Sequence, residues 1–158
     1  MSTQTDTNTT NARGPETMPF RFEVTTLPVS DVSRAKQFYV NQLGWREDID
    51  FEPAPGVRAV QVTPPGSKAS IQFGSTGASL PGPLQNLFLI VDDIVAARDE
   101  LISRGVDVGE IWHLEIGKGP VPGLDPQRAT YASRMNFADP DGNTWQVQEI
   151  TERLPGRV

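Results

Sequence analysis

Two side chains of this sequence have the chemistry of a proton donor and a proton acceptor, and each lies at or near the end of a predicted strand. His113 is the only histidine and ends the segment "VDVGEIWH", residues 106–113. Histidine is the side chain best suited to proton transfer near neutral pH. Glu149 is the only charged residue of "NTWQVQEI", residues 143–150. His113 and Glu149 are therefore candidates for a catalytic acid/base pair.

The turn before Glu149 determines which way its side chain points. Residues 139–143, "DPDGN", form a tight turn, because the proline presets φ, the glycine permits positive φ, and the Asp and Asn side chains can bond nearby backbone. In the strand that follows, alternation places Trp145, Val147 and Glu149 on one face. If that face lines a cavity, apolar neighbours raise the pKa of the carboxyl group. A calcium-binding loop is excluded, because the acidic ligand positions do not match.

Composition limits the function classes. The chain has 158 residues, of which 37% are hydrophobic, and this is typical of one domain with a core. Its net charge of −6 argues against nucleic acid or an anionic membrane as a partner. The absence of cysteine excludes disulfides, thiolate metal sites and a cysteine nucleophile. Since no apolar run is typical of a membrane span or a signal peptide, we expect a cytoplasmic protein.

The chain contains an internal repeat of about sixty residues, since residues 27–45 are similar to residues 89–106. In each copy an aspartate, Asp31 or Asp93, precedes a helical apolar pattern, and its carboxylate can accept the free amides of the first turn. A glycine then follows, which suits the left-handed residue that ends a helix. The closing glycines are Gly44 and Gly105, and the predicted helices span residues 32–42 and 94–104.

The strands complete a βαβββ pattern that occurs twice, which predicts an α+β domain with two similar half-sheets. The long loop 114–129 interrupts the second copy, and loops of this length are commonly functional. The predicted strands span residues 20–28, 45–51, 57–63, 68–74, 84–91, 106–113, 130–138 and 143–150. The predicted organisation is a flexible segment 1–18, a first module 19–74, a linker 75–83, a second module 84–150 and a tail 151–158.

The segments "PVSDVSRAKQFYVNQLGW", "IVDDIVAARDELISRGV" and "FADPDGNTWQVQE" together resemble the vicinal oxygen chelate superfamily, the glyoxalase/bleomycin-resistance/dioxygenase fold. The resemblance covers about residues 20–155. It implies two βαβββ modules that form a curved mixed sheet around a cavity, often in a homodimer. It does not determine the activity, because the fold hosts lyases, isomerases, dioxygenases and drug-binding proteins.

The resemblance also implies where a metal would be held. In the metal-dependent members of the family, the glutamate at the position of Glu149 is a ligand. The other ligand positions carry over to Val24, Phe73 and Asn86, and of these only asparagine can ligate, weakly. We therefore expect no cofactor and no metal centre. The alternative is a divalent ion at Glu149, with an alignment shift of one residue that brings in Glu23, Gln72 or Gln85.

Several residues are candidates for binding a substrate. Arg128, in the long loop, could bind a carboxylate or phosphate group, although an ordinary surface arginine explains it equally well. Tryptophans could stack on an aromatic ligand, although burial alone also explains them. The predicted substrate-binding residues are Arg128, Tyr131, Trp112, Trp145, Asn86 and Phe73.

Three functions follow, each with a small organic molecule as partner and with a homodimer expected. In the first, His113 and Glu149 transform the molecule by metal-independent acid/base chemistry, as in a lyase or isomerase. In the second, the protein sequesters a drug or metabolite, as bleomycin-resistance relatives do. The third is a metal-dependent glyoxalase or dioxygenase, which Val24 and Phe73 disfavour.

Overall fold

The computed structural model describes residues 18–74 and 82–155. Most of the predicted N-terminal segment 1–18 and of the linker 75–83 therefore lies outside the described residues. None of the helices within these ranges is long and apolar enough to cross a membrane.

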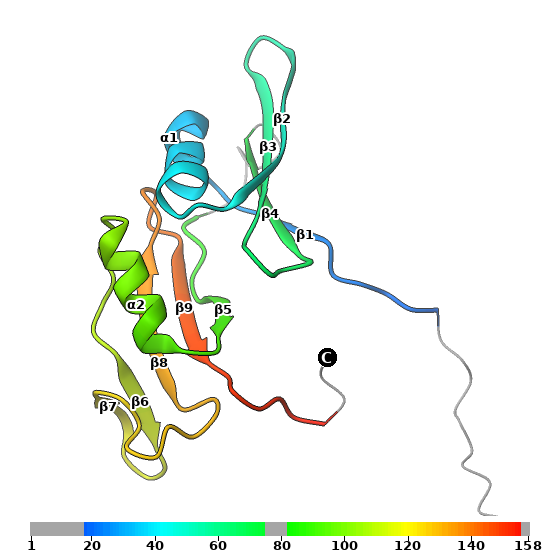
Figure 1. The fold of residues 1–158 in the computed structure, drawn as a ribbon. Coiled ribbons are helices and arrows are strands. Elements are labelled where there is room, and N and C mark those ends of the chain that lie inside the picture. Colours follow the sequence, from blue (N-terminus) through cyan, green and yellow to red (C-terminus); the bar gives the residue numbers. More distant parts are fainter. Residues whose placement is uncertain (1–17, 75–81, 156–158) are drawn as a thin grey trace, which may run out of the picture.

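The predicted α+β class is confirmed, with one mixed sheet for each module (Figure 1). In the first sheet the strand order is β1-β4-β3-β2, and in the second it is β5-β9-β8-β6-β7. The first module consists of β1 (Val24–Thr26), α1 (Val32–Lys36), the π-helix η1 (Gln37–Gln42), β2 (Arg46–Ala54), β3 (Val57–Thr63) and β4 (Ser70–Gly74). The second consists of β5 (Leu87–Val91), α2 (Ile94–Ser103), β6 (Trp112–Glu115), β7 (Gly119–Pro122), β8 (Ser133–Ala138) and β9 (Thr144–Glu149).

The predicted ends of the helices are confirmed. The Asp31 carboxylate accepts a hydrogen bond from a first-turn amide at the start of α1, and that of Asp93 accepts two at the start of α2. Gly44 and Gly105 have φ of 74° and 75°, the left-handed conformation that glycine adopts without steric cost. The first helix differs in one respect, since it widens into a π-helix after Lys36.

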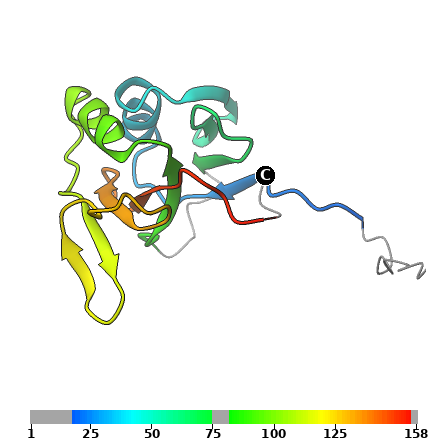
Figure 2. The ribbon, with the colours of Figure 1, turned by 60° about the horizontal axis from the view of Figure 1, so that its bottom comes forward.

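Two predictions for the second module are wrong. The strand expected at residues 106–113 begins only at Trp112, and the loop 114–129 contains the β6–β7 hairpin, which extends from the body of the molecule (Figure 2). The hairpin was not recognised because β7 is only four residues long and contains two prolines, which are tolerated on an edge strand.

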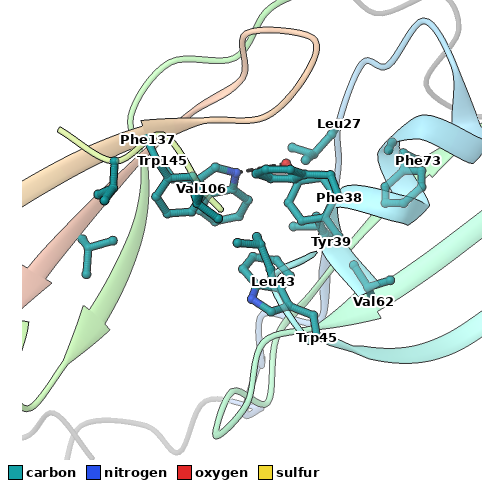
Figure 3. Close-up of a cluster of buried hydrophobic side chains, with 14 of the residues drawn as sticks. Leu27, Phe38, Tyr39, Leu43, Trp45, Val62, Phe73, Val106, Phe137 and Trp145 are labelled. Carbon is teal, nitrogen blue, oxygen red and sulfur yellow. Dashed lines mark hydrogen bonds between the residues drawn. The ribbon is translucent and has the colours of Figure 1, made fainter. Parts of the chain in front are cut away.

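The two modules share one aromatic core (Figure 3). Tyr39 and Trp45 of the first module pack against Trp145 of the second, with ring centroids 6.2 and 5.3 Å away. Phe73 packs against Tyr39 from the first sheet at 5.7 Å. Trp145 and Phe73, both predicted to bind substrate, are only 4% and 0% exposed and lie in this core. The inner faces of both sheets are therefore used for packing, and their opposite faces are turned outward.

Candidate functional site

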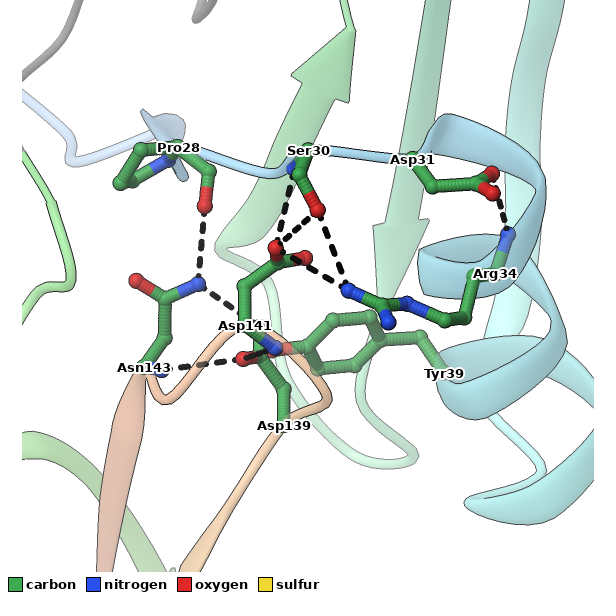
Figure 4. Close-up of polar contacts among 8 residues, drawn as sticks. All are labelled: Pro28, Ser30, Asp31, Arg34, Tyr39, Asp139, Asp141 and Asn143. Atoms are coloured by element: carbon green, nitrogen blue, oxygen red, sulfur yellow. Dashed lines mark hydrogen bonds and ion pairs between the residues drawn. The ribbon is translucent and has the colours of Figure 1, made fainter.

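The "DPDGN" turn joins the two modules (Figure 4). One carboxylate oxygen of the buried Asp139 accepts bonds from the amides of Asp141 and Asn143, both at 2.9 Å. Its other oxygen accepts the Tyr39 hydroxyl and the Asn143 side-chain amide, both at 2.8 Å. The Asp141 carboxylate in turn accepts the backbone amide of Ser30 at 3.0 Å. The sequence indicates the role of this turn in strand register, but its contacts with the first module depend on residues more than a hundred positions away.

Tyr39 is a neutral hydrogen-bond donor in the contact between the turn and the first module. Its hydroxyl donates to Asp139 and accepts from the Trp145 indole nitrogen at 3.0 Å. Burial, together with the nearby charge of Asp139, raises the pKa of Tyr39 well above its ordinary value. The phenol therefore stays protonated, and its hydroxyl links the first module to Asp139 and Trp145 of the second.

Glu149 lies on the predicted face with Trp145 and Val147, but this face packs against the core and the start of α2. Its side chain is fully buried. Its carboxylate accepts two hydrogen bonds from Arg128, at 3.0 and 2.6 Å, and one from the Ile94 amide at 2.9 Å. The Arg128 contact lowers the pKa of Glu149, so the expectation of a raised pKa is wrong. Glu149 is a paired anion whose oxygens already have partners.

His113 is also bonded to the loop that follows β7. The residue is 6% exposed, and its ring Nδ1 lies 2.8 Å from the carbonyl oxygen of Gly123. A carbonyl can only accept, so Nδ1 carries the proton. The register partner of His113 is Ser133, whose hydroxyl oxygen accepts the Asp125 amide at 3.1 Å.

His113, Ser133 and Glu149 lie near one another on three neighbouring strands: Ser133 is the register partner of His113, and Ser133 and Glu149 each adjoin the register pair Arg134 and Gln148. Neighbouring strands lie about 4.8 Å apart, so His113 and Glu149 are roughly 10 Å apart across the row. They are too distant for a direct hydrogen bond. All three side chains instead hold residues 123–128 against the sheet, and we call them the loop-holding row.

Arg128 and Tyr131 end this loop in an unusual backbone conformation. Their φ values are 49° and 70°, in the left-handed region that few non-glycine residues adopt. The Tyr131 carbonyl accepts the Gln148 side-chain amide at 2.7 Å, and its hydroxyl accepts the Leu154 amide at 3.2 Å. Both residues are thus engaged within the chain. Of the six predicted substrate-binding residues, only Asn86, which is exposed, and Trp112 lie outside the core and this loop.

The residues that the family resemblance assigns to a metal do not fit one. Phe73 lies in the core, Val24 cannot ligate, and Glu149 is paired with Arg128. Within the described ranges, no three His, Asp or Glu side chains come together in a way that could hold a metal ion. The expectation of no cofactor remains a prediction, and no step below depends on a metal.

The accessible side chains of the second sheet lie on the opposite face, away from the loop-holding row. Trp112, Arg134 and Gln148 are neighbours in one register row, and this row ends at Ile90 on the edge strand β5. We call this surface the outer face. Its side chains are Trp112, Arg134, Asn136, Gln146, Gln148, Phe88 and Ile90, of which Gln146 and Gln148 are buried beneath their neighbours. None of these is a histidine or a carboxylate.

The outer face combines apolar and polar groups. Phe88 and Ile90 are 58% and 44% exposed. The Arg134 guanidinium donates to the Gln146 side-chain oxygen at 3.0 Å and lies 5.7 Å from the centre of the Trp112 ring. Arg134 was not among the predicted site residues: alternation along β8 separates it from Ser133 and Met135, but it does not reveal which face is accessible or that Arg134 lacks a carboxylate partner.

A hollow of about 620 Å³ adjoins the outer face at β5. Phe88 and Ile90 line it together with the charged residues Lys68, Asp92 and Arg153. Its volume lies within the range of small-molecule sites, about 300–1,000 Å³. A smaller hollow of about 170 Å³ lies on the other side of β5, between that strand, α2 and Trp45.

The chain belongs to the glyoxalase/bleomycin resistance protein/dioxygenase superfamily, because the model of that family matches residues 21–147. The resemblance inferred from the motifs is therefore confirmed. No curated protein matches the chain significantly.

Solved structures have the same fold. The antibiotic-binding protein TnmS3 from Streptomyces sp. CB03234 is 28% identical over 85% of this chain and 99% of its own, with a TM-score of 0.61. A superfamily member from Sphaerobacter thermophilus is 30% identical over 84% of this chain and 99% of its own, also with a TM-score of 0.61. A glyoxalase/bleomycin resistance protein from the same Streptomyces strain is 30% identical over 82% of this chain and 100% of its own, with a TM-score of 0.57.

Proposed function

We propose that this protein binds a small organic molecule on the outer face and in the adjoining hollow, and that it releases the molecule unaltered. One observation carries the proposal. The outer face offers apolar, amide and guanidinium groups but no histidine or carboxylate, whereas His113 and Glu149 lie on the other face and hold a loop. Asp92 and Lys68 line only the adjoining hollow. An arginine side chain is not deprotonated in proteins, so Arg134 can bind a ligand but cannot act as a general base.

The composition of the site supports this proposal. Small-molecule sites are mostly apolar and contain a few polar groups that set the orientation of the ligand. Phe88 and Ile90 supply exposed apolar surface, and the half-buried Arg134 and Asn136 supply polar groups on the same face. The structural relative TnmS3 is an antibiotic-binding protein, which is consistent with the same use of the fold here.

Binding is testable with an uncharged fluorescent probe, N-phenyl-1-naphthylamine. We expect the wild-type protein to bind it, and Phe88→Asp to weaken binding by about tenfold or more, because a charge replaces apolar contact surface. Ile116→Asp is the matched control, since Ile116 is a fully exposed residue near the tip of the β6–β7 hairpin. Equal affinity in the Phe88 and Ile116 variants would refute the proposed location.

The acid/base hypothesis remains the competing prediction, and the fate of a natural ligand distinguishes the two. Any ligand captured from small-molecule mixtures should be recovered with its mass and structure unchanged. A chemically altered product that no longer forms with His113→Ala would instead support the enzyme. That variant must retain ligand binding for the result to count.

We also propose that a second copy of the chain covers the outward-turned face of the first sheet, away from the outer face of the second sheet. Ile49 and Phe51 on β2 are 48% and 59% exposed, and Phe20 and Phe22 in the segment before β1 are 93% and 70% exposed. Large apolar patches on a protein surface commonly mark interfaces. Light scattering at micromolar concentration should give twice the mass of one chain, and Phe22→Asp should shift the population toward monomer. A wild-type protein that is monomeric at all concentrations would contradict this.

A further inference from the structure

Arg134 differs from the other arginines in the described part of the chain. It is partly buried on the outer face, and it forms no ion pair there. Its Nε is buried without a hydrogen-bond partner among the described residues. Arg21 and Arg153 are exposed. The arginines that pair with carboxylates are Arg34, Arg46, Arg58, Arg98, Arg104 and Arg128.

The hydrogen bonds of Arg134 leave much of its donor capacity unused. A guanidinium has five N–H groups in a planar fork. One terminal nitrogen donates to Gln146 at 3.0 Å, and the other lies 3.5 Å from the Tyr131 carbonyl oxygen, a long contact. Both acceptors are neutral, so within residues 18–74 and 82–155 the positive charge has no counter-charge. Burial lowers the pKa of Arg134 from its usual value, which indicates that the cation has lost part of its hydration.

A partly dehydrated cation without a counter-ion interacts strongly with an anion that reaches it, because less water has to be displaced and less water screens the charge. The neighbouring side chains do not oppose this. Trp112 contacts the guanidinium through its ring, and Asn136 and Gln146 are neutral amides. The local charge is therefore positive, although the whole chain has a net charge of −6.

The sheet register gives the distance between Arg134 and the exposed apolar side chains on the same face. Arg134, Gln148 and Ile90 are successive partners across β8, β9 and β5. With about 4.8 Å between strands, the exposed side chain of Ile90 lies roughly 10 Å from Arg134. Phe88 lies beside Ile90 on the same face and lines the same hollow.

We infer that the ligand of the outer face is an anion with an apolar body, whose carboxylate or sulfonate group binds the Arg134 fork while the body lies on Phe88 and Ile90. This inference rests on the proposed function, because it specifies the ligand of the same face. Bidentate binding of a planar or tetrahedral oxyanion is the recognition for which arginine geometry is suited.

Two related dyes test the inference, because they share an aromatic framework and differ in charge. 8-Anilinonaphthalene-1-sulfonate carries the anionic group, and N-phenyl-1-naphthylamine lacks it. We expect the wild-type protein to bind the sulfonate about tenfold more tightly. Arg134→Met should abolish this preference while the affinity for the neutral dye changes less than about twofold. Arg134→Lys should retain part of the preference, since it keeps the charge but not the fork.

Arg46→Met is the matched control, because Arg46 is a surface arginine with a 70% exposed side chain, and it should keep the full preference. Circular dichroism and thermal unfolding must show that each variant is folded, since partly unfolded proteins bind the sulfonate dye nonspecifically. If Arg134→Met does not fold, salt dependence in the wild-type protein serves instead. Added salt should weaken binding of the sulfonate and leave the neutral dye unaffected.

The outcomes separate this inference from the proposed function. If the wild-type protein binds both dyes equally and Phe88→Asp weakens both, the face binds apolar molecules and the anionic inference is wrong. If the preference for the sulfonate persists in Arg134→Met, Arg134 is not the anion site. If the wild-type protein binds neither dye, both proposals fail.

Discussion

Replacing Arg128 with methionine is expected to lower the free energy of unfolding by about 3–5 kcal/mol at pH 7, the range for a buried ion pair that loses one partner. Glu149 is fully buried, and without Arg128 its carboxylate keeps only the bond from the Ile94 amide. The loss arises mainly from this uncompensated anion, because the Arg128 side chain is itself 43% exposed. Denaturant unfolding monitored by tryptophan fluorescence measures the difference.

An exposed ion pair provides the control. Lys118 and Glu115 are joined at 2.7 Å, with side chains 69% and 41% exposed. Lys118→Met should therefore cost less than about 1 kcal/mol. The double variant Arg128→Met/Glu149→Gln should recover part of the stability lost in Arg128→Met, since the buried charge has been removed.

The pH dependence of the same variant has a definite sign. In the wild-type protein the pKa of Glu149 is lowered by Arg128, so its contribution is present above the unfolded-state pKa and is lost as pH falls through the folded-state pKa. In Arg128→Met, burial without a cation raises the pKa of Glu149 above the unfolded value. That variant gains stability from protonation as pH falls. The difference between the two proteins should therefore narrow toward about pH 4, and a difference independent of pH would contradict the assignment.

Asp139→Ala is expected to lower the free energy of unfolding by about 3 kcal/mol or more, because several buried donors lose their acceptor together. These donors are the Tyr39 hydroxyl, the Asn143 side-chain amide and two backbone amides of the turn. For a chain of this length the change corresponds to a decrease in melting temperature of about 6–12 °C. Thermal unfolding measures it, with the exposed Asp99→Ala expected to cost less than about 0.5 kcal/mol.

A double-mutant cycle with Tyr39→Phe tests whether the effect comes from the joint between the modules. Because the Tyr39 hydroxyl bonds directly to Asp139, the two substitutions should be coupled by about 0.5–3 kcal/mol. Coupling in this range would show that the bond between Tyr39 and the turn stabilises both modules together (Figure 4). Strictly additive effects would show that Asp139 stabilises only its own turn.

The sequence by itself determined the local features. Asp31, Asp93, Gly44 and Gly105 act at the helix ends because capping depends on backbone atoms within a few residues. The strand 57–63 was predicted with its correct bounds from its apolar residues and the turns that bracket it. The repeat of these local patterns was sufficient for the α+β class and for the family.

Only the tertiary structure decided how the candidate site residues are used. Alternation shows that Trp145, Val147 and Glu149 share a face. The alternation pattern would be identical whether that face lined a cavity or packed against a core. The partner of Glu149 is Arg128, which follows a hairpin and has positive φ, so no local pattern points to the contact. Conversely, Arg134 became a candidate only when the register placed it on the outer face without a carboxylate partner in the described chain. The physical reason is that local propensities act between neighbours in sequence, whereas burial, counter-ions and accessible faces are set by contacts between distant segments.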